Sequence, residues 1–312
     1  MSLSQARTAA GSRTGREPEI PTLLLALAIH GAWVLLTAWH AALPLPLLAL
    51  AGGAVIAAHG SLQHETIHGH PTGRRWIDTA IGSVPLSLWL PYSIYRRTHI
   101  AHHATPAITD PFDDPESNYL ASGAGPRHAL AVAEATLLGR LALGPPIRIG
   151  HFLIGEARRA VREPAAWARE WLPHLAGVAL LAGWLAHVDL PPGTYLLAFV
   201  YPGTALSLLR SFAEHRAVPD PRGRAAIVAR PGPFGLLFLN NNLHAVHHDR
   251  PDLAWYELPA HYRHHRDAYA DAPLYPGYGA IFRRHALRPH DAIVHPDHRD
   301  ARRDGHAERA RA

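Results

Sequence analysis

Four apolar runs, arranged as two adjacent pairs, constrain this chain more than any other feature. Residues 21–43 are long enough to cross a bilayer, which takes about 20 mostly apolar residues, and residues 45–60 follow after an uncharged turn. The second pair, 171–190 and 194–212, is joined by a short Pro-Pro-Gly turn. Within lipid, a segment must satisfy its own backbone polar groups, and runs of this length do so as helices. We therefore expect an all-α integral membrane protein with about four transmembrane helices in two hairpins.

The polar segments around these runs complete the expected organisation. Residues 1–20 contain arginines but no cleavage site of the signal-peptide type, so we interpret them as a disordered cytoplasmic tail. A Pro-interrupted stretch at 76–95 is typical of an interfacial or re-entrant segment, and 128–170 is expected to be helical and to lie on the membrane surface. Residues 21–288 then form one membrane domain, and the polar residues 289–312 are predicted to be a second disordered tail.

The charge distribution predicts orientation. All 30 basic residues are arginines, because the chain contains no lysine. They lie mainly in polar segments beside the apolar runs, which favours a membrane surface over nucleic acid as the anionic partner. The two hairpin turns carry almost none, so the positive-inside rule places both termini and the segments 60–170 and beyond 210 in the cytoplasm, on one side of a multi-pass protein.

Three histidine clusters lie at or beyond the ends of these runs. His64-Glu65-Thr66-Ile67-His68 places two imidazoles on one helix face, and alone it suggests a zinc metalloprotease with Glu65 as general base. Two clusters of the form H-x-x-H-H follow downstream: His99, His102 and His103, then His244, His247 and His248. Since a protease needs only three protein ligands on one zinc, eight clustered imidazoles indicate a site for two metal ions.

Ligand type alone leaves the metal open, because imidazole suits zinc, copper, iron and nickel. The absence of cysteine excludes thiolate ligands and iron–sulfur clusters. A metal transporter is disfavoured, since transport sites usually lie near the bilayer midplane. A further H-x-x-H-H sequence begins at His261, but it lacks an apolar approach and is interpreted as a solvated helix. The same structural or surface interpretation applies to His59, His70, His128 and the histidines of the C-terminal tail.

The three clusters resemble the histidine boxes of the integral-membrane fatty acid desaturase family. Neighbouring residues fit as well: Arg96-Arg97-Thr98 before the second box, Asp110-Pro111 after it, Asn240-Asn241-Asn242 before the third, and Trp255-Tyr256-Glu257-Leu258-Pro259 after it. The resemblance covers about residues 45–285. It implies a non-haem di-iron centre that activates O2, a cytoplasmic helical cap that carries the boxes, and a ninth ligand after the fourth run, for which His215 is the candidate.

Carboxylates and amides commonly hydrogen-bond the far nitrogen of a ligating histidine. Glu65, Glu214 and Asn241 are the candidates for this supporting role. Because adjacent residues on a helix point about 100° apart, each glutamate is expected to contact a histidine other than its sequence neighbour. Asp110, Asp113 and Asp114 could serve in the same way, but a role in the turn beside Pro111 and Pro115 is favoured.

The resemblance implies an O2-dependent oxidoreductase that introduces a double bond into a fatty acyl chain, with no catalytic residue beyond the metal centre. Its electrons would come from a separate ferredoxin- or cytochrome-like donor, docked on the basic cytoplasmic face. A hydroxylase or ketolase of the same superfamily, acting on an alkyl, sterol or carotenoid substrate, is the alternative. A membrane zinc protease built on His64 and His68 is the more distant one.

Overall fold

The computed structural model describes residues 17–298 apart from 221–222, and most of them are helical. The helices in chain order are α2 (Ile20–Ala38), η1 (His40–Ala42), α3 (Leu45–Ile67), α4 (Arg75–Gly82), α5 (Tyr92–Ala104), α6 (Pro126–Ala133), α7 (Leu137–Arg162), α8 (Pro164–His187), α9 (Pro192–Tyr195), the π-helical η2 (Leu196–Val200), α10 (Tyr201–Phe212), α11 (Phe234–Leu237), α12 (His244–Asp249), α13 (Leu258–His264), η4 (Arg266–Tyr269) and α14 (Tyr278–His285). Two short strands, β1 (Ile227–Val228) and β2 (Leu274–Tyr275), pair in parallel. The helical class was predicted correctly.

The first predicted hairpin corresponds to α2 and α3. Both helices are long and apolar enough to cross a membrane. Pro44 is the N-cap of α3, where its fixed φ suits a helix start. Leu24, Leu27 and Leu50 are exposed on the outside of the pair, as side chains that face lipid would be.

The second predicted hairpin differs from the expectation. Helix α8 and the continuous segment α9–η2–α10 meet the length and hydropathy requirements only as a pair, bent by 112° at the break between them. The described residues therefore contain two candidate spans, or three if the bent pair counts as one. Helix α8 begins at Pro164 and not near residue 171, and its first three turns carry Arg169, Glu170 and His174.

Helix α3 packs closely against η2 and α10. A Cβ added to Gly52 would lie 2.6 Å from the Ala198 carbonyl oxygen, and one added to Gly203 would lie 2.4 Å from Ile56 Cβ. Only glycine permits such an approach. A hydrogen-bond relay also ties the hairpins together, since Trp33 Nε1 donates to the Tyr195 hydroxyl at 2.9 Å. These contacts hold the first hairpin against η2 and α10.

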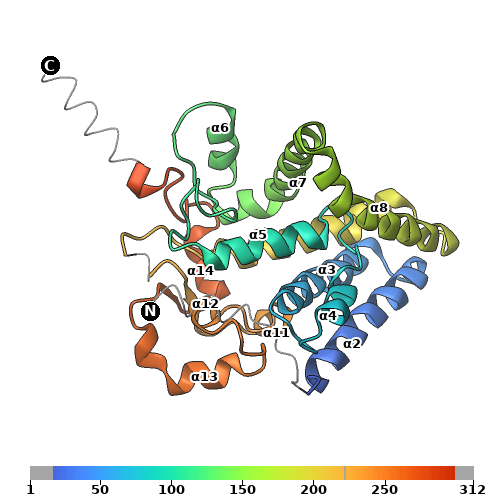
Figure 1. Cartoon of the computed structure of the whole chain (residues 1–312), viewed down its shortest axis with the longest axis horizontal. Helices are drawn as coiled ribbons and strands as arrows, with labels where there is room; N and C mark the ends of the chain where they lie inside the picture. Colours follow the sequence, from blue (N-terminus) through green and yellow to red (C-terminus); the bar gives the residue numbers. More distant parts are fainter. Residues whose placement is uncertain (1–16, 221–222, 299–312) are drawn as a thin grey trace, which may run out of the picture.

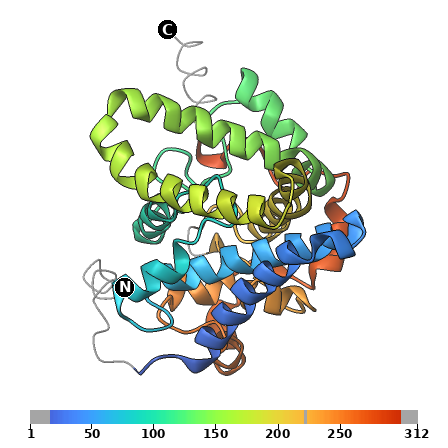
Figure 2. The same ribbon diagram turned by 90° about the vertical axis from the view of Figure 1, so that its right-hand side faces the viewer.

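Helix α5 crosses the middle of the molecule in Figure 1, with α2–α4 to its lower right and α12 to its lower left. Figure 2 shows that the chain turns back between α7 and α8, and that these two helices lie above the α2–α3 hairpin. The predicted interfacial stretch 76–95 contains most of α4, the connecting loop and the start of α5. The end of α3, α5 and α12, which carry the three histidine boxes, thereby come to face one another.

The prediction of a disordered C-terminal tail is wrong for residues 289–298, which pack onto the domain. Leu120 forms a parallel bridge with Val294, and His295 is fully buried. The polar composition suggested a solvated segment, but its histidines and aspartates find buried polar partners. We call residues 291–298 the C-terminal strap. Residues 299–312, like 1–16 of the predicted N-terminal tail, lie outside the described residues.

Candidate metal centre

The structure brings all nine predicted histidines together in two adjoining groups. His64 and His68 lie at the end of α3, the second box lies on α5, His215 follows α10, and the third box lies on α12. Within each group, one potential ligand atom per residue lies within 4.8 Å of the others. The first group is His64, His68, His99, His103 and His247, and the second is His102, His215, His244 and His248.

Helical spacing explains how each H-x-x-H-H box serves both groups. Residues i and i+4 lie about 40° apart around the helix axis, so they share a face, whereas i+3 lies on the other side of residue i. Accordingly His99 and His103 join the first group while His102 joins the second. In the third box, His244 and His248 share the second group and His247 joins the first.

The Nε2 atoms converge on the interior of this cluster. His68 Nε2 lies 3.0 Å from His99 Nε2, and His103 Nε2 lies 3.1 Å from His247 Nε2. In the second group, Nε2–Nε2 distances are 2.9 Å between His215 and His244 and 3.1 Å between His244 and His248. His64 Nε2 is buried without a hydrogen-bond partner among the described residues.

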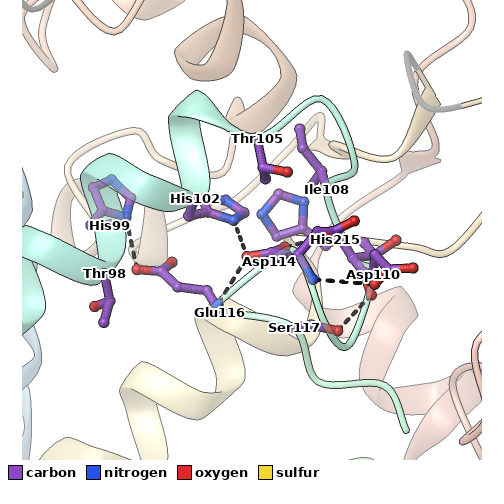
Figure 3. A network of polar contacts seen from close by, with 12 residues as sticks. Thr98, His99, His102, Thr105, Ile108, Asp110, Asp114, Glu116, Ser117 and His215 are labelled. Atoms are coloured by element: carbon purple, nitrogen blue, oxygen red, sulfur yellow. Dashed lines mark hydrogen bonds and ion pairs between the residues drawn. The ribbon is translucent and has the colours of Figure 1, made fainter. Parts of the chain in front are cut away.

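Several Nδ1 atoms face acceptors on the outside of the cluster, as Figure 3 shows for His99 and His102. His102 Nδ1 lies 2.7 Å from Asp114 Oδ1, and His99 Nδ1 lies 3.1 Å from Glu116 Oε1. His215 Nδ1 faces the Arg224 carbonyl at 3.2 Å. These acceptors place the proton on Nδ1 and leave Nε2 as an inward lone pair, the tautomer that a metal ligand needs.

A buried polar chain supports His244 in the same way. Asn241 Nδ2 donates to Glu214 Oε1 at 2.6 Å, which turns the amide oxygen of Asn241 toward His244 Nδ1 at 3.1 Å. Arg210 Nε lies 3.0 Å from the same glutamate oxygen. Glu214 Oε1 thus lies 3.6 Å from His244 Nδ1, as expected for a glutamate that contacts a histidine other than its sequence neighbour His215.

Glu65 makes a hydrogen bond outside the histidine cluster. Its Oε2 accepts a hydrogen bond from the Trp255 backbone amide at 3.1 Å. The imidazole near its carboxylate is that of its own neighbour His64, whose Nδ1 lies 3.7 Å from Oε1, beyond hydrogen-bond range. The expected contact with a histidine other than His64 stays a prediction: the Trp255 backbone occupies Oε2, and the His70 imidazole acts on the charge of the carboxylate.

Two further carboxylates support ligand candidates: Asp114, for which the turn role was favoured, and Glu116. Asp114 accepts from the amides of Thr109 and Glu116, both at 2.8 Å, as well as from His102. It therefore combines the expected turn role with orientation of a histidine. The sequence pattern did not predict a role for Glu116. The only signal was the acidic loop after the second box, and its return toward α5 depends on tertiary folding.

Burial and neighbouring imidazoles favour the neutral form of several ligand candidates. Burial, together with the neighbouring imidazoles, holds the pKa of His103, His244, His247 and His248 well below the ordinary histidine value. Neutral imidazole is the form that binds a metal ion. The cluster is therefore suited to cations held by nitrogen ligands.

The remaining histidines divide between surface and interior. His264 and His265 are exposed on and just after α13, and within the described part of the chain no residue of the His261 sequence belongs to a metal-compatible group. His59 is buried beside His30, and His70 pairs with Glu19 at 2.5 Å. Of the histidines predicted to be structural or on the surface, His295 is buried, and its side chain forms a third group with Asp110 and His298.

Comparison with known proteins agrees with this geometry. A family model described as fatty acid desaturase matches residues 37–279, a stretch that contains all three boxes and His215. No curated protein matches the chain. The chain therefore belongs to the fatty acid desaturase family, whose members are membrane-bound oxidoreductases that act on fatty acyl chains and generally use iron.

Proposed function

We propose that this protein is an O2-dependent desaturase that introduces a double bond into a fatty acyl chain at a centre of two iron ions. The contact between His215 and His244 carries this proposal. Both Nδ1 atoms face oxygen acceptors, so two Nε2 lone pairs oppose each other at 2.9 Å. A cation between them converts that repulsion into coordination.

The two groups provide one site each. His64, His68, His99, His103 and His247 would hold one ion, and His102, His215, His244 and His248 the other. Imidazole nitrogen suits iron among other first-row metals, and membership of the family favours iron. Glu214, Asn241, Asp114 and Glu116 orient ligands through Nδ1, while Glu65 supports the end of α3 from the side of Trp255.

Iron bound in this centre would supply the O2 chemistry that breaks unactivated C–H bonds, which no side chain can do as an acid or base. The overall reaction removes two hydrogens from adjacent carbons and reduces O2 to two waters, with two electrons and two protons from outside. The protein's own part is to fix the nine imidazoles, exclude bulk water and position the acyl chain. Since the chain contains no cysteine, a separate ferredoxin- or cytochrome-like protein would deliver the electrons.

The same proposal includes a membrane topology. The α2–α3 hairpin would cross the bilayer, and α8 with α9–α10 would form the second membrane-embedded pair of a domain spanning 21–288. The histidine boxes and both termini would face the cytoplasm. The concentration of arginines outside the hairpin turns supports this orientation. Arg158, Arg162 and Arg169 extend the basic surface on which an electron donor could dock.

Lipid analysis of a host that expresses the protein tests the activity. New unsaturated acyl chains should appear with the wild type and with His264→Ala, whose imidazole is exposed on α13. They should be absent with His103→Ala or His244→Ala, which each remove a ligand from one group. Unchanged acyl chains accompanied by an oxygenated alkyl, sterol or carotenoid product would contradict desaturation and assign a hydroxylase or ketolase.

A further inference from the structure

A third group of metal-compatible side chains lies outside the nine-histidine cluster. Asp110, His295 and His298 each offer a ligand atom, and the three atoms lie within 4.8 Å of one another. Two imidazoles and one carboxylate form a ligand set that suits zinc or ferrous iron. This set joins two segments that are far apart in the sequence: the loop after the second box and the C-terminal strap.

The carboxylate of Asp110 is held in place before any ion arrives. Its Oδ1 accepts from the amides of Phe112 at 2.8 Å and Asp113 at 3.2 Å. This leaves Oδ2 facing His298 Nε2 at 2.8 Å. The carboxylate is therefore aimed at the strap by the turn that carries it.

His295 offers a buried nitrogen. Its side chain is fully buried, and Nε2 lies 3.0 Å from the Thr109 hydroxyl. Nδ1 has no hydrogen-bond partner among the described residues; Asp297 Oδ2 lies 3.7 Å away and is paired with Arg224. With Nε2–H donating to Thr109, Nδ1 carries the lone pair. A buried polar atom without a partner is costly, and a cation would satisfy it.

We propose that Asp110, His295 and His298 bind a third divalent transition-metal ion that clamps the C-terminal strap onto the loop after the second box. Solvent reaches the site, because the His298 side chain is 27% exposed and Asp110 14%. The clamp would also affect the main centre, because Asp110 is hydrogen-bonded to Asp114, which orients the ligand candidate His102. Asp114 donates its backbone amide to the Asp110 carbonyl at 3.0 Å and orients His102 through its side chain.

Metal analysis of the purified full-length protein tests this directly. The protein is loaded with iron and zinc, freed of excess metal and measured by mass spectrometry. We expect about three ions per chain in the wild type, two from the main centre and one from the third group. His298→Ala and Asp110→Asn should each bind about one ion fewer, and His264→Ala should match the wild type. Two ions in the wild type, or unchanged content in both variants, would overturn the proposal.

A second measurement does not depend on variants of the third site. In His244→Ala, which weakens the main centre only, added zinc should slow amide hydrogen exchange of Leu120 and His295. These amides donate to Ile293 and Leu120 carbonyls, both at 2.9 Å, and so report on docking of the strap. Exchange that is unchanged by zinc would overturn the clamp, whatever the activity of the enzyme.

Discussion

Replacing Asp114 by asparagine should weaken the binding of one metal ion and leave the binding of the other unchanged. Asp114 Oδ1 accepts from His102 Nδ1 at 2.7 Å and from the Glu116 amide at 2.8 Å, while Oδ2 accepts from the Thr109 amide at 2.8 Å. Asparagine can present its oxygen to only one side of this network. At least one buried N–H donor then faces an NH2 group, which costs about 1–3 kcal/mol.

The loss should appear mainly as metal affinity. Removing a partner that orients a ligating histidine typically lowers affinity by about 10- to 100-fold, equivalent to about 1.4–2.8 kcal/mol. His102 belongs to the second group alone. In a chelator challenge of the iron-loaded protein, Asp114→Asn should therefore lose about half of its iron at a chelator concentration that leaves the wild type loaded.

Asp113→Asn is the matched control. Asp113 carries the same chemistry one residue earlier, but its side chain is exposed. This variant should retain iron as the wild type does. If Asp114→Asn holds both ions as tightly as Asp113→Asn, Asp114 does not orient a ligand and the reasoning from the Nδ1 contacts is refuted.

Two further substitutions test the other group and the packing of α3. Glu116→Gln should lower the iron affinity of the first group by about tenfold, because Glu116 contacts the ligand candidate His99. The same chelator challenge measures this affinity. An unchanged affinity would show that the 3.1 Å contact between Glu116 and His99 does not affect metal binding. Gly52→Ala should destabilise the protein by about 1–3 kcal/mol, because the new Cβ would lie 2.6 Å from the Ala198 carbonyl. Thermal unfolding in detergent measures this, and Gly31→Ala, which meets nothing within 4 Å, serves as control; equal effects would contradict the close packing.

The histidines of the centre could be predicted because their spacing is local. The i, i+3 and i+4 pattern places the eight box histidines on known helix faces, whereas His215 was expected only from the resemblance to the family. Their division into groups of five and four depends on how α3, α5 and α12 approach one another. That tertiary arrangement cannot be derived from spacing within any one box.

The supporting residues show the same limit. Asn241 lies three residues before His244 and could be identified as a candidate from local sequence. Asp114 and Glu116 reach His102 and His99 only because their loop folds back on α5. Glu65 was assigned a histidine partner by helical geometry, but the Trp255 amide, distant in sequence, occupies its carboxylate.

Composition predicted the membrane segments better than the chain ends. The α2–α3 hairpin lies close to the predicted apolar runs, whereas α8 extends upstream into a charged stretch. The strap was assigned to a solvated tail because it is rich in His and Asp. Its burial follows from specific partners, such as Thr109 for His295, that composition cannot reveal.

Iron analysis of the purified protein tests the central claim most directly. The two histidine groups predict about two iron ions per chain, and fewer when His103 or His244 is replaced by alanine. A wild-type protein without iron would contradict a di-iron centre, and a single zinc ion that is lost in His68→Ala but retained in His298→Ala would assign the zinc site expected from His64 and His68 alone.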